Sequence, residues 1–287
     1  MGTKRSWEGQ LVASQSADGA YDSMTSTESA GSTISIFETI RDELDEHHDR
    51  RERIIKVSRD ITALSKKIIF ALQRVRVTNQ PIPPKIAKEN QTRFDQIHNL
   101  FTSIIPDVTG INAWRYQRQI SGGVQEFIEA VSFDHYLRTQ TLISHEETAA
   151  RLPSEILITE EDYLMGLFDL TGEMMRFAVL ALSSGNATPA HQSTEMDTTE
   201  DNAPNLPNLS DTQASIVGDL RAMRARFEAL SLSRKYNMMR DLQKKVETMQ
   251  NSVEKVERAA YGILVRGSER PSGWTPDLSG PVEVESH

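Results

Sequence analysis

Apolar residues recur at spacings of three and four over most of the chain. The first such run covers residues 35–77 and predicts a long amphipathic helix. The segment TNQPIPP at residues 78–84 ends this helix, because proline cannot continue a helix interior. The same spacing predicts further helices at residues 85–105, 111–144, 160–184, 211–232 and 234–264, with a polar connector at residues 145–155.

A β-sheet is not expected. No run of Val, Ile and Thr alternates with polar residues between turn signals, as the strands of a half-buried sheet would require. No constant repeat length is present either, which argues against a repeat array. The sequence therefore predicts an all-α fold, a bundle of six to seven mostly antiparallel helices.

Three segments lack the helical periodicity. Residues 1–33 are rich in Ser, Thr, Gly and Ala, and we expect a disordered N-terminal tail. Residues 185–213 hold five acids, three prolines and no base, which is typical of a flexible loop. Residues 268–287 combine prolines with acids and predict a disordered C-terminal tail. A single helical domain is left at residues 34–267.

The amino-acid composition excludes several kinds of site. Among its 287 residues the chain has no cysteine, so it contains no disulfide scaffold, Cys-ligated metal site or cysteine nucleophile. The sequence also lacks a P-loop, a G-x-G-x-x-G fingerprint and a G-x-S-x-G nucleophile motif. Carboxylate and histidine side chains are left as the candidates for metal chemistry.

The net charge of −9 is unevenly distributed. Residues 1–36, 185–213 and 268–287 together carry −10, which leaves +1 for the rest of the chain. Residues 50–93 contain twelve bases and three acids, and residues 221–245 contain eight bases and two acids. Bases that share one helix face could neutralise the phosphates of a nucleic acid. The alternative is a solvated helix surface, or bases that pair with acids elsewhere in the fold.

The sequence contains few signals that indicate a cellular location. The first thirty residues contain no apolar core of the kind found in secretory signals. Residues 163–182 are nearly long enough to cross a membrane, but Asp169, Glu173 and Arg176 would each be costly near a bilayer centre. We therefore expect a buried helix there and no membrane partner, and the sequence leaves cytoplasm, nucleus or both as the location.

Four acids lie in the least charged of the predicted helices. Glu126 and Glu129 are three residues apart in ISGGVQEFIEAVSF, and Asp169 and Glu173 are four apart in YLMGLFDLTGEMMRFAVLAL, so each pair shares one helix face. If the two pairs meet across the bundle, their oxygens suit Mg²⁺ or Mn²⁺, which prefer hard carboxylate ligands. A bound ion could polarise a phosphoryl oxygen and activate a water molecule.

The spacing of these acids is by itself only weak support for a metal site. Glu254 and Glu257 repeat it in heavily charged surroundings that are typical of a solvated face. The apolar flanks distinguish the four candidate acids, because an unpaired buried carboxylate is costly. The alternative to a metal site is that the four acids form salt bridges with Arg176, Arg138 or a lysine of the first helix.

Two further clusters could bind a ligand, but each also has a purely structural interpretation. His47 and His48 are adjacent, so they do not share a helix face, and the surrounding acids favour a solvated patch over a metal site. Trp114, Tyr116 and Arg118 form an aromatic and basic cluster that could stack on a single-stranded base. Packing between helices is the favoured interpretation of this cluster, because large aromatic side chains are so often buried.

Four segments resemble the translin-associated factor X branch of the translin superfamily. They are residues 37–75, QEFIEAVSFDHYL at 125–137, DYLMGLFDLTGEMMR at 162–176 and YGILVRGSERP at 261–271. The resemblance covers residues 35–272 with the segments in the right order. The DLTGE and VRGSE sequences are typical of this branch and not of translin itself.

The resemblance implies a translin-like bundle that assembles with translin into a closed, barrel-like hetero-oligomer. It also implies a Mg²⁺-dependent endoribonuclease that cleaves single-stranded RNA, including small-RNA passenger strands and tRNA-precursor fragments, with single-stranded DNA as a further ligand. The family's acidic catalytic cluster matches Glu126, Glu129, Asp169 and Glu173, which are therefore the expected catalytic and metal-binding residues. The alternative is a non-catalytic nucleic-acid-binding or scaffolding partner of translin.

Overall fold

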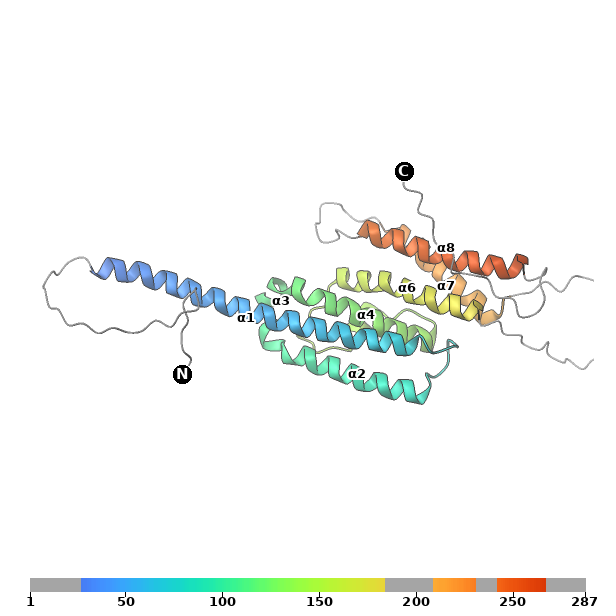
Figure 1. Cartoon of the computed structure of the whole chain (residues 1–287), viewed down its shortest axis with the longest axis horizontal. Coiled ribbons are helices and arrows are strands. Elements are labelled where there is room, and N and C mark those ends of the chain that lie inside the picture. The colour runs from blue at the N-terminus through green and yellow to red at the C-terminus, as the bar shows by residue number, and fades with distance from the viewer. Residues whose placement is uncertain (1–26, 184–208, 231–241, 267–287) are drawn as a thin grey trace, which may run out of the picture. The chain divides into compact units, whose positions relative to one another are not determined.

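The structure, a computed structural model, describes residues 27–183, 209–230 and 242–266 (Figure 1). Every regular element in these ranges is helical, which confirms the predicted all-α fold. The chain divides into two compact units, residues 1–49 and residues 50–287. The single domain at residues 34–267 stays a prediction.

Six long helices and three short ones make up the described ranges. They are α1 (Thr27–Leu72), α2 (Pro84–Ser103), the 3₁₀ turn η1 (Ile105–Asp107), α3 (Ile111–Arg115), α4 (Gln117–Thr139), α5 (His145–Ala149), α6 (Glu160–Ser183), α7 (Asp211–Glu228) and α8 (Leu242–Arg266). Helix α1 begins at Thr27, so residues 27–33 are helical where a disordered tail was predicted. The predicted acidic loop and C-terminal tail lie almost wholly outside the described residues.

The helix predicted at residues 111–144 is interrupted. Tyr116 separates α3 from α4, and α4 ends at Thr139 because Gln140 adopts a left-handed conformation with φ 53°. Where a polar connector was predicted, Ser144 begins the short helix α5. Its side chain accepts a hydrogen bond from the Glu147 N–H, and the Glu147 side chain accepts one from the Ser144 N–H. This capping box satisfies donors that a helix start otherwise leaves unpaired.

The core of the second unit follows the predicted apolar stripes. Ile54, Ile61 and Ile68 recur every seven residues on α1, and each has an exposed fraction of zero. Helix α6 packs against α4, α7 and α8, which places it at the centre of the bundle (Figure 1). No helix in the described ranges is long and apolar enough to span a membrane.

Two glycines let neighbouring helices approach α4 closely. A methyl group on Gly166 of α6 would lie 2.6 Å from Ile128 Cγ2 and 3.0 Å from the Gln125 carbonyl oxygen. A methyl group on Gly123 would lie 2.9 Å from the Ser58 carbonyl oxygen of α1. Both distances are too short for a side chain, so glycine is required where α4 meets α6 and α1.

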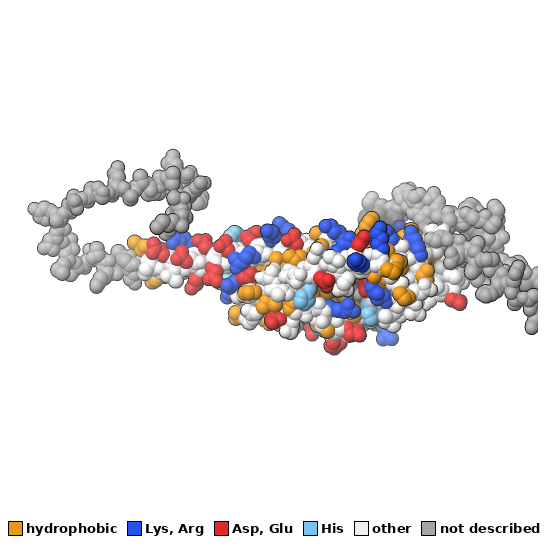
Figure 2. All heavy atoms as spheres, turned by 90° about the horizontal axis from the view of Figure 1, so that it is seen from below, with side chains coloured by type: hydrophobic (Ala, Val, Ile, Leu, Met, Phe, Trp, Pro, Cys, Tyr) orange, Lys and Arg blue, Asp and Glu red, His pale blue; other side chains and the backbone are white. Residues whose placement is uncertain are grey.

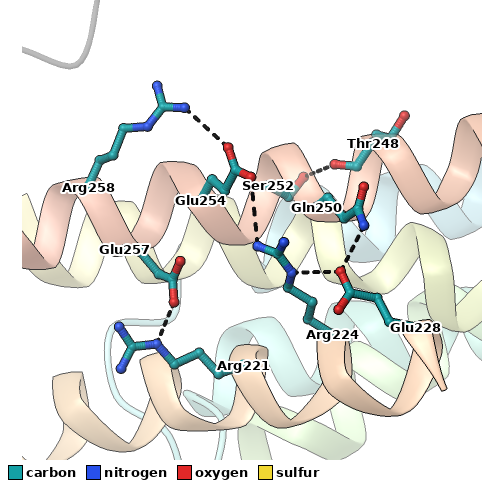
Figure 3. A network of polar contacts seen from close by, with 9 residues as sticks. All are labelled: Arg221, Arg224, Glu228, Thr248, Gln250, Ser252, Glu254, Glu257 and Arg258. Atoms are coloured by element: carbon teal, nitrogen blue, oxygen red, sulfur yellow. Dashed lines mark hydrogen bonds and ion pairs between the residues drawn. The ribbon is translucent and has the colours of Figure 1, made fainter.

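Part of the second basic stretch is neutralised inside the fold. Figure 3 shows Arg221 of α7 bonded to Glu257 of α8 at 2.5 Å. Arg224 reaches Glu228 at 2.9 Å and Glu254 at 3.8 Å in the same network. For these two arginines, pairing with acids elsewhere is the correct interpretation, and the contacts link α7 to α8.

The close approach at Gly166 can be tested against Gly172 on the same helix, where an added methyl group would meet nothing within 4 Å. We expect Gly166→Ala to lower the free energy of unfolding by about 1–3 kcal/mol, because the contact with Ile128 becomes overpacked. Gly172→Ala should leave stability equal or raise it by up to about 1 kcal/mol, through helix propensity. Urea denaturation measures both, and equal midpoints for the two variants would contradict the close packing.

Candidate functional site

The four predicted acids line one pocket. Its volume is about 690 Å³, and its wall includes Glu126 and Glu129 from α4 and Asp169 and Glu173 from α6. Helices α1 and α8 also contribute to the lining, with Lys66 from α1 and Lys245 from α8, and α6 adds further residues such as Arg176. The structure therefore brings together the two carboxylate pairs that the sequence placed on separate helices.

The helix contact at Gly166 explains this convergence. Ile128, which the glycine touches, stands between Glu126 and Glu129 in the sequence, and Gly166 lies one helical turn before Asp169. Because α4 and α6 are closest at this point, the acids that flank the contact face the same space. Gly172 also lines the pocket, and it has open space where a side chain would stand.

Glu129 is the most perturbed of the four acids. Its exposed fraction is 8%, and none of the described residues forms a hydrogen bond or ion pair with its carboxylate. Burial raises the pKa of Glu129 to about 8, and the charges of Asp169, Glu126 and Glu173 raise it further. At neutral pH, without a cation beside it, this side chain therefore holds a proton.

Glu126 has a similar environment but a basic partner. Burial raises the pKa of Glu126, while the Lys66 ammonium, 3.2 Å from its Oε1, offsets part of that rise. Lys66 lies on α1, so the ion pair joins α1 to α4. The alternative predicted from the sequence, a salt bridge to a lysine of the first helix, is correct for this acid.

The two acids of α6 are also paired. Lys245 of α8 forms an ion pair with Asp169, and Arg176 forms one with Glu173. Gln73, in the turn that follows α1, adds a hydrogen bond, because its Nε2 donates to Glu173 Oε2 at 2.6 Å. The predicted contact with Arg176 is therefore present.

Arg138 does not take part in the pocket. It was the other predicted partner of the four acids, but its guanidinium bonds Asp134 on its own helix at 2.7 Å. Of the three partners proposed from the sequence, only Arg176 and a lysine of α1 reach the pocket.

The donor type of the pocket, carboxylate oxygen, suits a hard divalent cation, but the placement of the donors does not yet form a site. Four carboxylates face one cavity, and Glu129 forms no ion pair or hydrogen bond with the described residues, although the charge of Lys245 acts on it. As they are placed, however, no three acidic or histidine side chains of the described ranges are close enough together to share an ion. The three basic partners supply the positive charge instead, so a bound ion would have to compete with them.

Gln73, Lys245 and Phe70 are among the pocket residues that sequence reasoning missed. Each comes from a segment that carries none of the candidate acids, so no local spacing connects it to them. The nearest signal was the basic character of residues 221–245, which includes Lys245 without indicating its partner.

The other clusters weighed from the sequence do not join the pocket. Tyr116 is buried with an exposed fraction of 4%, as the packing interpretation requires, whereas Trp114 is 66% exposed. In the described ranges His47 and His48 belong to no group of three potential metal ligands.

Comparison with known proteins identifies the family of the fold. The model of the translin family matches residues 49–267, which hold all four acids of the pocket. The chain belongs to the translin family. The matched range begins at the boundary between the two compact units, so the family fold corresponds to the second unit.

Within the translin family, the chain is similar to members of two kinds. It is 30% identical over 266 residues to translin-associated protein X of Rattus norvegicus, with 84% of this chain and 82% of the relative covered. The Schizosaccharomyces pombe homolog of translin-associated protein X is 29% identical, with 82% and 89% covered. Translin of Homo sapiens is 25% identical, with 82% and 94% covered.

Solved structures support the translin-like fold. The crystal structure of apo-NeC3PO aligns with a TM-score of 0.55 at 18% identity and covers 77% of this chain and 94% of its own. AfC3PO aligns with a TM-score of 0.54 at 17% identity, with 80% and 97% covered. At this level of identity the likeness concerns the fold alone.

The raised pKa of Glu129 has a consequence for stability. The unfolded chain loses this proton near pH 4.5 and the folded chain near pH 8, so in metal-free buffer stability should fall as the pH rises between these values. The contribution of one such group has a slope of about 1.4 kcal/mol per pH unit. Glu129→Gln should remove this contribution, whereas Glu43→Gln, at an exposed position of α1, should retain it. Chemical denaturation across this pH range measures the slope, and an unchanged slope in Glu129→Gln would refute the assignment.

Proposed function

We propose that this chain is the catalytic subunit of a translin-containing hetero-oligomer, a Mg²⁺-dependent endoribonuclease that cleaves single-stranded RNA. The observation that carries the proposal is the pocket that collects Glu126, Glu129, Asp169 and Glu173 from two apolar helices. Burying four carboxylates together is costly unless cations or protons compensate for them. A fold that nevertheless places them together is typical of a site with a chemical role.

The four carboxylates would hold Mg²⁺, with Mn²⁺ as an alternative. A divalent ion supplies the Lewis acidity that phosphodiester hydrolysis needs. Glu129 holds a proton at neutral pH and would release it when it becomes a ligand, so ion binding should be accompanied by proton release. Lys66, Lys245 and Arg176 surround the same space and provide positive charge for a phosphate.

The proposed partner is a translin-type subunit. Support comes from the family match, from the similarity to translin-associated protein X, and from the translin-like fold. The RNA would follow basic side chains of residues 50–93, and Figure 2 shows Lys and Arg side chains on one face, interspersed with hydrophobic ones. We place this activity in the cytoplasm and nucleus.

A second function, a non-catalytic nucleic-acid-binding scaffold, is favoured by one observation. Three of the four acids already have a basic partner, so the pocket is largely compensated without an ion. A scaffold of this kind would bind nucleic acid through phosphate contacts, so its affinity would fall steeply with salt concentration. This binding would persist when the four carboxylates are removed.

Substitution of the acids separates the two functions. In the complex with a translin-type partner, Glu126→Gln and Asp169→Asn should each lower Mg²⁺-dependent cleavage of a single-stranded RNA by at least about 100-fold. The reason is that the ion contributes several kcal/mol of transition-state stabilisation, and each 1.4 kcal/mol is a factor of ten. The measurement is single-turnover cleavage of an end-labelled oligonucleotide.

The matched control is Glu254→Gln. Glu254 and Glu257 have the same three-residue spacing as Glu126 and Glu129, but Glu254 does not line the pocket and pairs with Arg224 and Arg258. This variant should cleave like the wild type. If Glu126→Gln and Asp169→Asn cleave normally, the catalytic assignment is wrong. If the wild type binds RNA without cutting it in either Mg²⁺ or Mn²⁺, the scaffold is the correct function.

A further inference from the structure

An aromatic side chain stands at the edge of the carboxylate pocket without a role in the core. Phe70 of α1 lines the pocket, yet its exposed fraction is 75%. Single exposed apolar residues are common on protein surfaces, so exposure alone carries little weight. The location of Phe70 needs an explanation, because an exposed apolar ring is unexpected beside a pocket that is lined largely by acids and bases.

The other aromatic residue of the pocket behaves differently. Phe168 of α6 is 3% exposed and stacks on Phe227 of α7 with ring centroids 4.1 Å apart. Phe70 has no such ring contact with any residue of the described ranges. Its neighbour Ile69 takes the buried position on α1, with an exposed fraction of 6%. Phe70 therefore presents a ring face to solvent beside the acids.

The helix surface around Phe70 is basic and polar. Lys66 and Lys67 lie four and three residues before it on α1, and Gln73 and Arg74 lie three and four residues after it in the turn that follows α1. The side chains of Lys66 and Arg74 are 65% and 53% exposed, although Lys66 pairs with Glu126 and Arg74 with Glu89. An aromatic ring among exposed bases is the usual composition of a surface for single-stranded nucleic acid, where bases stack on rings and phosphates meet cations.

We infer that Phe70 is a stacking platform for an unpaired base of the RNA strand, next to the phosphodiester that reaches the carboxylate pocket. The reaction in this inference rests on the proposed function, whereas the stacking contact does not. Phe70 acts as a positioning residue, because the ring holds the base and thereby places the adjacent backbone. It also confers specificity for single strands, since a base inside a duplex has no free face to offer.

A protein partner is the competing explanation of the exposed ring. The core of a protein interface is depleted of charged residues, whereas Phe70 is surrounded by two lysines and an arginine at helical spacing. Ile69 and Ile68, its apolar neighbours in the sequence, are buried in the core and provide no apolar patch around the ring. The composition of the surface therefore favours a nucleic acid.

The test is a coupling experiment between the ring and the base. The full-length chain, in the oligomeric form in which it purifies, is titrated in EDTA with a labelled single-stranded RNA and with matched strands that each carry one abasic position. We expect Phe70→Leu to weaken binding of the intact strand by about 10-fold. The wild type should show a similar loss on one abasic strand, and on that strand Phe70→Leu should cause no further loss.

Two more variants exclude a structural effect. Phe70→Trp keeps a ring face and should bind the intact strand at least as tightly as the wild type. Tyr261→Leu removes an aromatic ring that is 63% exposed on α8 and does not line the pocket, and it should not change the affinity. Circular dichroism and the oligomeric mass are measured for each variant.

Every outcome decides the inference. It is wrong if Phe70→Leu binds the intact strand like the wild type, or loses equal affinity on every strand. It is also wrong if the variant loses only oligomeric mass, which would assign Phe70 to a protein contact. If the ring and the base couple as expected but the wild type cuts no RNA in Mg²⁺, the stacking contact stands and the proposed nuclease function fails.

Discussion

The close approach of α4 and α6 at Gly166 is the constraint on which the rest of the pocket depends. With no side chain on that glycine, the backbone of α6 lies against Ile128, and the acids on either side of the contact share one cavity. The same closeness gathers like charges in a partly buried space, where the charges of Asp169, Glu126 and Glu173 disfavour the ionisation of Glu129. Tight helix packing and an electrostatic cost therefore arise from one contact, and the chain has to compensate for the cost.

The compensation comes from three directions. Lys66 of α1, Lys245 of α8 and Arg176 of α6 each neutralise one carboxylate, which leaves Glu129 as the acid without a cation among the described residues. The pair of Lys66 joins α1 to α4 and the pair of Lys245 joins α8 to α6, whereas the pair of Arg176 lies within α6. Any cation that enters must either replace one of these bases or bind where Glu129 gives up its proton. The affinity of the pocket for an ion is thus a competition between groups of the chain itself and the ion.

Local patterns were enough to predict part of this arrangement. The apolar period placed α6 within one residue of its observed bounds, and the apolar flanks separated the four acids from the solvated pair at Glu254 and Glu257. The break at Tyr116 was missed because the apolar spacing continues through it. Helix α5 was missed although Ser144 and Glu147 spell its capping box. Lys245 could not have been found, since its partner Asp169 is 76 residues away and only tertiary packing joins them.

The distribution of charge shows how a chain of net charge −9 can still offer a path for a polyanion. Residues 50–93 and 221–245 are both basic in composition, but their bases differ in how far they are paired with acids of the fold. Arg221 and Arg224 are committed to Glu257, Glu228 and Glu254, so the surface between α7 and α8 is internally neutralised (Figure 3). On α1, Lys67 has no ion pair with the described residues, and it lies three residues from Phe70 in the sequence. Because phosphates are attracted by bases that are not already paired, such a base would favour the proposed path along α1.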